Sequence, residues 1–319
     1  MPRTGNKWDQ RIDRARELAK AYPFSAEILS FYCKLTAFQK TFYVQFQSAG
    51  GSQDRRRGSR LPPLDEAELG LLHTRWSPFL SLIAREAPAS LAEFARGLNS
   101  RGPSAGAALL RSVWPEGPPA ATEAGEVGAP LVGAHTTLPQ QRATTRVAPT
   151  SAGECQSARR KPPAQPPEHN PCERFCAQAF LQPYAEFLAD QADVPAPPFR
   201  RPVCPYCGSP PLVGVLRPEG DGAKRSLVCS FCRTEWDYLR IACPGCEEPR
   251  EQKLCVYSTP AFEGVRVEAC DTCGTYIKTI DLTLNGLALP EVDELAAVPL
   301  TLWADEKGYR KVARNVIGL

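Results

Sequence analysis

Apolar residues in the first part of the chain recur at steps of three and four, the spacing of one face of a helix. Residues 9–47 therefore predict two helices. Asp9 is expected to cap the first helix, and Ser25 the second after a break at Pro23. The second helix carries a mostly aromatic stripe: Ile28, Phe31, Leu35, Phe38, Phe42 and Phe46. We interpret this stripe as packing core, and a groove for a partner peptide between helices is the alternative.

The same spacing returns twice further along the chain. Residues 64–98 predict helix divided into pieces at Pro78 and Pro88, because proline interrupts the helical hydrogen bonds. The apolar side of this segment is formed by Leu69, Leu72, Trp76, Phe79, Leu80 and Ile83. Residues 172–190 predict a further helix, with Phe175, Phe180, Tyr184, Phe187 and Leu188 on its apolar side. An arginine triplet within residues 50–58 predicts a solvated loop.

Residues 115–167 have a different composition from the helical segments around them. They contain ten prolines, five glycines and no aromatic residue. Such a segment cannot bury enough apolar surface to offset the entropy lost on ordering. We predict a disordered insertion or linker that interrupts one helical domain, formed by residues 1–114 and 168–199.

The last third of the chain changes to short alternating runs typical of β-strands. Residues 200–282 hold “PLVGVL”, “SLVC”, “VRVEAC” and “YIKTIDLTL”, separated by turn residues. Residues 283–319 predict a C-terminal helix and an irregular end, with Leu295, Val298, Leu302 and Trp303 docking onto the rest. The expected fold class is α+β: an N-terminal helical domain, two tandem rubredoxin-like or zinc-ribbon modules, and a C-terminal helix.

Four Cys-x-x-Cys pairs lie in this β-rich part, and they hold eight of the 13 cysteines. This spacing lets two sulfurs face one point while backbone N–H groups of the turn point at them. Four thiolates complete a tetrahedral shell that suits zinc or a rubredoxin-type iron. The candidate metal ligands are Cys204, Cys207, Cys229, Cys232, Cys243, Cys246, Cys270 and Cys273.

Gly208 and Gly274 follow the first and last pairs, where such a turn takes a positive φ. Arg233 and Glu247 take that place in the middle pairs, whose turns we expect to differ slightly.

The gaps between the pairs indicate how they combine. They contain 21, 10 and 23 residues in order, so each outer gap is long enough for a hairpin that brings two turns together. Sequential pairing, first pair with second and third with fourth, is therefore the simplest prediction and gives two metal ions. A cross-braced arrangement, first with third and second with fourth, stays open. Thiol–disulfide exchange normally needs a single pair at a helix start, so four pairs argue against it.

The composition argues against several classes of function. The formal charge is +3, and residues 200–282 carry eleven basic and eleven acidic residues, so nucleic-acid binding is not favoured. The chain has no long apolar run and no recognisable signal sequence, so we expect a cytoplasmic protein without membrane insertion. No histidine lies within 200–282, which argues against an open catalytic zinc. His169, Cys172 and Cys176 are interpreted as part of an ordinary helix, and Cys255 as a spare thiol near the second site.

Five segments form a distinctive combination: “CPYCGSPP”, “CSFCRTEWDYLRIACPGC”, “VEACDTCGTYIK”, “DELAAV” and “EKGYRKVARN”. In this order they resemble the formate dehydrogenase accessory proteins of the FdhE family, closely over residues 200–319 and more loosely over the N-terminal helices. Residues 115–167 are unlike the family, and Pro299 and Thr301 also depart from its pattern.

The resemblance implies a non-enzymatic, cytoplasmic maturation factor that binds the catalytic subunit of formate dehydrogenase. It also implies that the eight paired cysteines hold two metal ions, with rubredoxin-type iron favoured over zinc, and that none of them is a catalytic nucleophile. A stand-alone rubredoxin-like electron-transfer protein is the alternative, and a zinc-ribbon nucleic-acid-binding protein is a weaker one.

Overall fold

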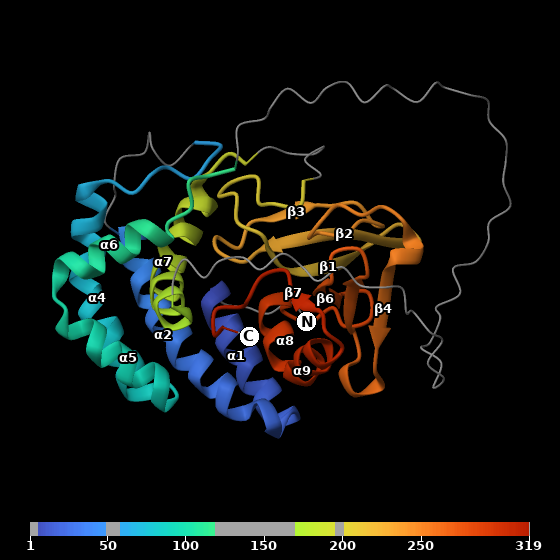
Figure 1. Ribbon diagram of the computed structural model, residues 1–319, viewed down its shortest axis with the longest axis horizontal. Helices are drawn as coiled ribbons and strands as arrows, with labels where there is room; N and C mark the ends of the chain where they lie inside the picture. The colour runs from blue at the N-terminus through green and yellow to red at the C-terminus, as the bar shows by residue number, and fades with distance from the viewer. Residues whose placement is uncertain (1–5, 49–57, 119–169, 195–200, 319) are drawn as a thin grey trace, which may run out of the picture.

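The computed structural model describes residues 6–48, 58–118, 170–194 and 201–318. Most of the predicted insertion at 115–167 and of the loop at 50–58 lies outside these ranges, as do Cys155 and His169. The described chain has a helical part and a single β-sheet, with two short C-terminal helices beside them (Figure 1).

Helices on both sides of the proline-rich stretch pack together in the helical part. Helix α7, which follows that stretch, contacts α2, α4, α5 and α6. In Figure 1, α4, α5 and α6 form the outer edge and α7 and α2 lie inside. The helices are α1 (Lys7–Ala21), α2 (Ala26–Ser48), α4 (Glu66–Glu86), α5 (Ala89–Ser100), α6 (Pro103–Val113) and α7 (Pro171–Gln191).

The helix starts differ from two of the sequence predictions. Asn6, and not Asp9, caps α1, because its side chain accepts a hydrogen bond from the Trp8 amide at 3.0 Å. Ser25 directly precedes α2, but its hydroxyl donates to the Ala296 carbonyl at 2.8 Å and so contacts the C-terminal region. The capping residue of α4, Asp65, forms a reciprocal pair of hydrogen bonds with Glu68.

Only one of the two prolines divides residues 64–98. Pro88 separates α4 from α5, as predicted, whereas Pro78 lies within an uninterrupted α4, so that prediction was wrong. Proline removes one backbone hydrogen bond from a helix interior. The neighbouring Phe79 and Leu80 are fully buried in the core, and this packing holds the helix through the proline.

The aromatic stripe of α2 forms the centre of the helical core. Phe42 lies 5.1 Å from Phe180 of α7 between ring centroids, and Phe38 lies 5.5 Å from Phe79 of α4. Phe46 packs against Tyr184 at 4.6 Å. The stripe is therefore filled by the protein's own helices, which confirms its interpretation as core and removes the alternative of a peptide groove there.

The two predicted ribbons are joined into one seven-stranded sheet of order β3-β2-β1-β6-β5-β4, with β7 also pairing with β6. The antiparallel strands of each ribbon pair as expected. Strands β1 and β6 pair in parallel, Val213 beside Lys278 and Leu216 beside Asp281, and this seam unites the ribbons. The strands are β1 (Pro211–Glu219), β2 (Gly222–Cys229), β3 (Glu235–Asp237), β4 (Leu254–Ser258), β5 (Val265–Cys270), β6 (Thr275–Asp281) and β7 (Arg310–Lys311).

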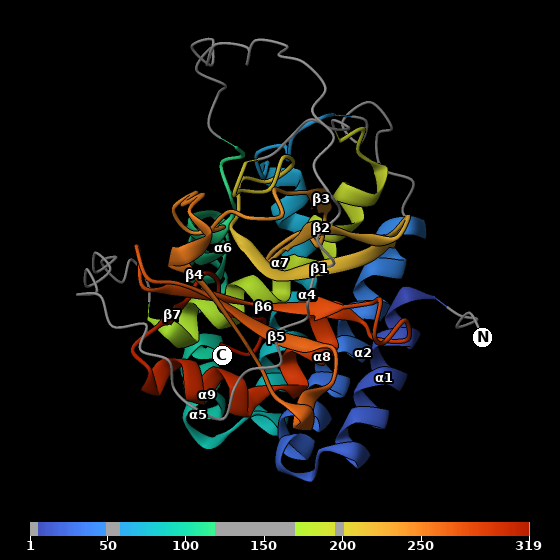
Figure 2. The ribbon, with the colours of Figure 1, turned by 90° about the vertical axis from the view of Figure 1, so that its right-hand side faces the viewer.

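The C-terminal segment forms two short helices and a strand where one helix was predicted. Helix α8 (Pro290–Ala296) contacts α1 on one side and strands β1 and β6 on the other, so it lies between the helical part and the sheet (Figure 2). Helix α9 (Val298–Glu306) follows directly. Leu295 is buried as expected, whereas Leu302 is 56% exposed and does not dock.

A buried lysine holds the junction between these two helices. Lys278 of β6 donates to the carbonyl oxygens of Glu294 at 2.6 Å and Ala297 at 3.2 Å, and to the Thr301 hydroxyl at 2.9 Å. The Glu294 carboxylate pairs with Lys278 at 2.9 Å and also with Lys311. The carbonyl groups at the end of α8 thus accept hydrogen bonds from Lys278 of the sheet, and these bonds fix where the helix ends.

Candidate metal centre

Each of the four cysteine pairs forms a tight turn with a similar backbone path. In the first, the Gly208 amide donates to the Cys204 carbonyl at 3.0 Å, and the Cys204 amide donates to Ser209 at 2.9 Å. The residue after the second cysteine takes a positive φ in all four: Gly208 (76°), Arg233 (62°), Glu247 (59°) and Gly274 (67°). The middle turns were expected to differ slightly, and the third does not: Glu247 has the positive φ of the outer glycines, and its amide donates to the Cys243 carbonyl at 2.8 Å. The second turn has the same positive φ, but its Cys229 carbonyl accepts from the Arg233 guanidinium at 3.3 Å.

The structure groups the pairs sequentially into two clusters. Cluster 1 contains Cys204, Cys207, Cys229 and Cys232, and cluster 2 contains Cys243, Cys246, Cys270 and Cys273. Within each cluster all sulfur atoms lie within 4.8 Å of one another. The predicted sequential grouping is thus confirmed, and the cross-braced arrangement is excluded.

The sulfur geometry fits a tetrahedral metal site. In cluster 1 the sulfurs of Cys204 and Cys232 are 3.6 Å apart, and those of Cys207 and Cys229 are 3.4 Å apart. In cluster 2 the corresponding distances are 3.6 Å for Cys243 and Cys273 and 3.8 Å for Cys246 and Cys270. A tetrahedron with metal–sulfur bonds of about 2.3 Å has sulfur–sulfur edges of about 3.8 Å.

Nearby groups also support thiolates in both clusters. The amides of Phe231 and Cys232 point at the Cys229 sulfur at 3.3 and 3.4 Å, and the Gly245 amide points at the Cys243 sulfur at 3.2 Å. The Thr275 hydroxyl lies 3.0 Å from the Cys273 sulfur, and its counterpart Thr234 lies 3.1 Å from Cys232. Threonine two residues after the last cysteine of each cluster is a signal that spacing analysis did not use.

The cysteine chemistry of the described chain favours metal binding over disulfides. All twelve described cysteines are unbridged. A shell of four thiolates lowers the charge of a divalent or trivalent ion without leaving an open position, which suits structural zinc or one-electron iron chemistry. Both clusters would hold one ion each.

The remaining thiols lie apart from the clusters. Cys176 is buried in α7, where burial raises its pKa to about 12, and Cys172 lies one turn earlier. Cys255 of β4 contacts the Asp271 carboxylate at 3.7 Å, beside cluster 2 but outside its ligand set. No third group of metal-ligating side chains occurs within residues 6–48, 58–118, 170–194 and 201–318.

Cluster 1 is part of the helical core. Its four cysteines and the intervening Tyr206 and Phe231 are each at most 2% exposed. The Phe231 ring packs edge-on against Trp114 at 5.7 Å, and the Tyr206 carbonyl accepts from the Leu61 amide at 2.9 Å. The backbone of Gly117 passes so close to Gly208 that a side chain at 208 would lie 2.6 Å from its carbonyl oxygen. Segments from the helical part therefore cover this site.

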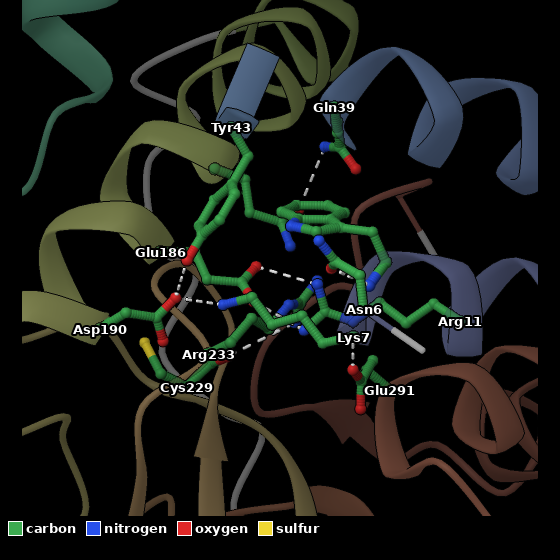
Figure 3. A network of polar contacts seen from close by, with 12 residues as sticks. Asn6, Lys7, Arg11, Gln39, Tyr43, Glu186, Asp190, Cys229, Arg233 and Glu291 are labelled. Carbon is green, nitrogen blue, oxygen red and sulfur yellow. Dashed lines mark hydrogen bonds and ion pairs between the residues drawn. The ribbon is translucent and has the colours of Figure 1, made fainter. Parts of the chain in front are cut away.

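A buried charge network next to cluster 1 joins three parts of the chain (Figure 3). Arg11 of α1 makes two hydrogen bonds to Glu186 of α7, at 2.9 and 3.0 Å, and one to Glu291 of α8 at 2.6 Å. Burial alone would raise the pKa of Glu186, but Arg11 and Lys7 hold it below its usual value.

Arg233 brings the cluster 1 turn into this network. Its guanidinium donates to the Cys229 carbonyl at 3.3 Å. With the Gln182 amide turned so that its oxygen faces Arg233, the guanidinium also donates to that oxygen at 2.8 and 3.1 Å. Burial alone would raise the pKa of Glu291. The positive charge of Arg11, and after it that of Arg233, holds this pKa below its usual value. The sequence did not reveal this role, since Arg233 acts on residues 51 and 58 positions away.

The fold and site define an α+β protein. It has a helical part and one sheet, and the turns of that sheet region hold two ribbon-type four-cysteine clusters. Residues 203–240 match the family domain described as “FdhE, central domain”, and residues 241–317 match “FdhE, C-terminal domain”. Over residues 203–317 the chain is therefore similar to the FdhE family, as the sequence resemblance indicated.

Known relatives match over part of the chain. A protein FdhE homolog of Aquifex aeolicus is 37% identical over 147 residues, which cover 46% of this chain and 52% of that protein. A homolog of Stutzerimonas stutzeri is 35% identical over 118 residues, covering 36% of this chain and 38% of its own. The matches thus span about half or less of the length of these relatives.

The fold likeness extends over nearly the whole chain. The crystal structure of the FdhE protein from Pseudomonas aeruginosa superposes with a TM-score of 0.61, covering 97% of this chain and 94% of that one, at 21% identity. Among the described residues, no helix is long and apolar enough to cross a membrane.

Proposed function

We propose that this protein is a cytoplasmic accessory factor, without enzymatic activity of its own, needed to produce active formate dehydrogenase. The observation that carries the proposal is that residues 203–317, which match the family's two domains, contain both complete cysteine clusters. The partner is the catalytic subunit of formate dehydrogenase, and no nucleic acid takes part.

The two clusters bind one metal ion each, iron in preference to zinc. Zinc would serve only to fix the turns, whereas iron in a thiolate shell can also change its oxidation state. In this proposal the helical part and the sheet form the surface that holds the immature subunit, and the metal sites keep that surface in place. Release follows when the subunit is complete.

The test combines partner binding with metal content. The full-length chain is produced together with the catalytic subunit of formate dehydrogenase, and the co-purified subunit and the bound metal are measured. We expect the subunit to co-elute with a chain holding two metal ions. The double variant Cys204→Ser/Cys207→Ser should lose metal and partner together, whereas Cys172→Ser, outside the clusters, should lose neither. Full formate dehydrogenase activation by a folded, metal-free variant would refute the metal-dependent part.

A second candidate is electron transfer through rubredoxin-like iron. The exposure of Cys246 favours it, because an electron donor needs to approach a redox metal closely. Rapid reversible reduction of the purified protein by a physiological donor, without any binding of the formate dehydrogenase subunit, would support this candidate. Subunit binding that does not depend on the iron oxidation state would argue against it.

A further inference from the structure

The two clusters differ in what stands between their cysteines. In cluster 1 the second intervening residue is Tyr206 in one turn and Phe231 in the other, and both rings are buried. In cluster 2 the same positions hold Gly245 and Thr272. Cluster 2 therefore lacks the aromatic cover that cluster 1 carries in its own sequence.

The accessibility of the ligands follows this difference. The four cysteines of cluster 1 are at most 1% exposed, whereas Cys246 is exposed and Cys273 is partly exposed. Gly245 and Glu247, on either side of Cys246, are also exposed. One edge of cluster 2 thus faces solvent, while Cys243 and Cys270 anchor its inner side.

The surroundings differ in the same direction. Cluster 1 belongs to the core of the helical part, and Trp114 and the Gly117 backbone lie over its turns. The cluster 2 turns are supported from within the sheet region: Tyr238 donates to the Cys243 carbonyl at 3.0 Å, and Tyr309 donates to Asp271 at 2.7 Å. Opening cluster 1 disturbs the helical core, and opening cluster 2 at Cys246 does not.

From this asymmetry we propose that cluster 2 is an exchangeable metal site that opens at Cys246, while cluster 1 is a permanent structural site. An incoming chelating or thiolate ligand binds the metal from the exposed edge as the bond to the Cys246 sulfur breaks. The released thiolate stays in solvent or takes up a proton from water. The metal content of cluster 2 can then change while the arrangement of helices and sheet persists.

This inference rests on the proposed function only in that both clusters hold metal. The test uses the full-length protein with the two metal ions it carries when purified. Excess EDTA is added, and the metal remaining in the protein is measured over time after rapid desalting. We expect one equivalent to leave at least tenfold faster than the other, a difference of about 1.4 kcal/mol in activation free energy.

Alkylation identifies which cluster loses its metal in the fast phase. N-ethylmaleimide added during the fast phase should modify Cys243, Cys246, Cys270 and Cys273 and leave the cluster 1 cysteines unmodified. A Phe231→Ala variant should speed the slow phase and leave the fast phase unchanged, and if it does not fold, the alkylation map of the unaltered protein still decides.

Two results would overturn the inference alone. One is metal loss in a single phase, and the other is modification of cluster 1 cysteines during the fast phase. Neither result depends on partner binding, so both can be told apart from a failure of the proposed function. A protein that carries metal at fewer than both clusters would overturn the inference and the metal part of the proposed function together.

Discussion

Gly214 of β1 lies directly across from Thr279 of β6, at the parallel seam where the two ribbons become one sheet. A Cβ atom at position 214 would lie 2.4 Å from the Thr279 hydroxyl oxygen and 3.3 Å from its Cβ. Strands can approach here because one of them has no side chain. The seam, and with it the fixed relation between the two clusters, depends on this pair.

Replacing Gly214 with alanine should weaken the seam. Overpacking a well-filled site costs about 1–3 kcal/mol, whereas removing a strand glycine gains about 0.5–1 kcal/mol, so we expect a net destabilisation of about 1 kcal/mol. Thr279→Ala creates room, and the double variant should recover at least half of the loss. Chemical denaturation of the single and double variants measures the coupling. Strictly additive effects would show that the two residues do not constrain each other.

Among the described residues, Arg233 and Glu247 are the two non-glycine residues with positive φ, and they give a matched pair for testing Arg233. Glu247→Gly should stabilise the protein by about 1 kcal/mol, because glycine adopts this conformation without steric cost. Arg233→Gly gains the same backbone relief but loses the hydrogen bonds to Cys229 and Gln182, so it should destabilise by about 1–3 kcal/mol. Thermal and chemical unfolding compare the two. If both variants stabilise equally, the Arg233 side chain does not join cluster 1 to the helices.

The Arg11 network should contribute far more than a surface ion pair. Arg11→Met leaves Glu186 and Glu291 without their main buried partner, which is expected to cost about 3–5 kcal/mol. The control is Arg16→Met on the same helix. Arg16 and its partner Asp13 are 66% and 64% exposed, so its loss should cost less than about 1 kcal/mol. Equal unfolding free energies for the two variants would contradict the inferred role of Arg11.

We expect Glu294 to make the free energy of unfolding depend on pH. Burial alone would raise its pKa, but Lys278 and Lys311 hold it at about 2, below the usual 4.5. Because the folded-state pKa is the lower one, this stabilisation is present above pH 4.5 and is lost as the pH falls toward 2. Glu294→Gln removes it and leaves two buried lysines without their anion, so the variant should be several kcal/mol less stable at pH 7.

The same variant supplies the control for acid effects at the cysteine clusters. The difference in unfolding free energy between the unaltered protein and Glu294→Gln should shrink as the pH falls from 5 to 3. Cysteine protonation affects both proteins alike and cancels in this difference. A difference that stays constant over this range would place the acid dependence elsewhere.

Local pattern was enough for much of this protein. The three- and four-residue spacing of α2 identified its core stripe, and alternating apolar runs located β1, β2, β5 and β6. The gap lengths between cysteine pairs favoured the two sequential clusters, but they left a cross-braced pairing open that the structure excludes. Where local signals misled, as at Pro78 and Asp9, packing and a better-placed cap at Asn6 decided the outcome.

Only the tertiary structure decided how these pieces combine. The parallel pairing of β1 with β6 joins residues more than 60 positions apart, and Arg233 reaches Gln182 across the boundary between sheet and helices. The difference in exposure between the clusters likewise depends on which segments of the helical part lie over them. Periodicity reports which face of an element is buried, but it does not say which distant surface buries it, because that choice depends on complementary packing between whole elements.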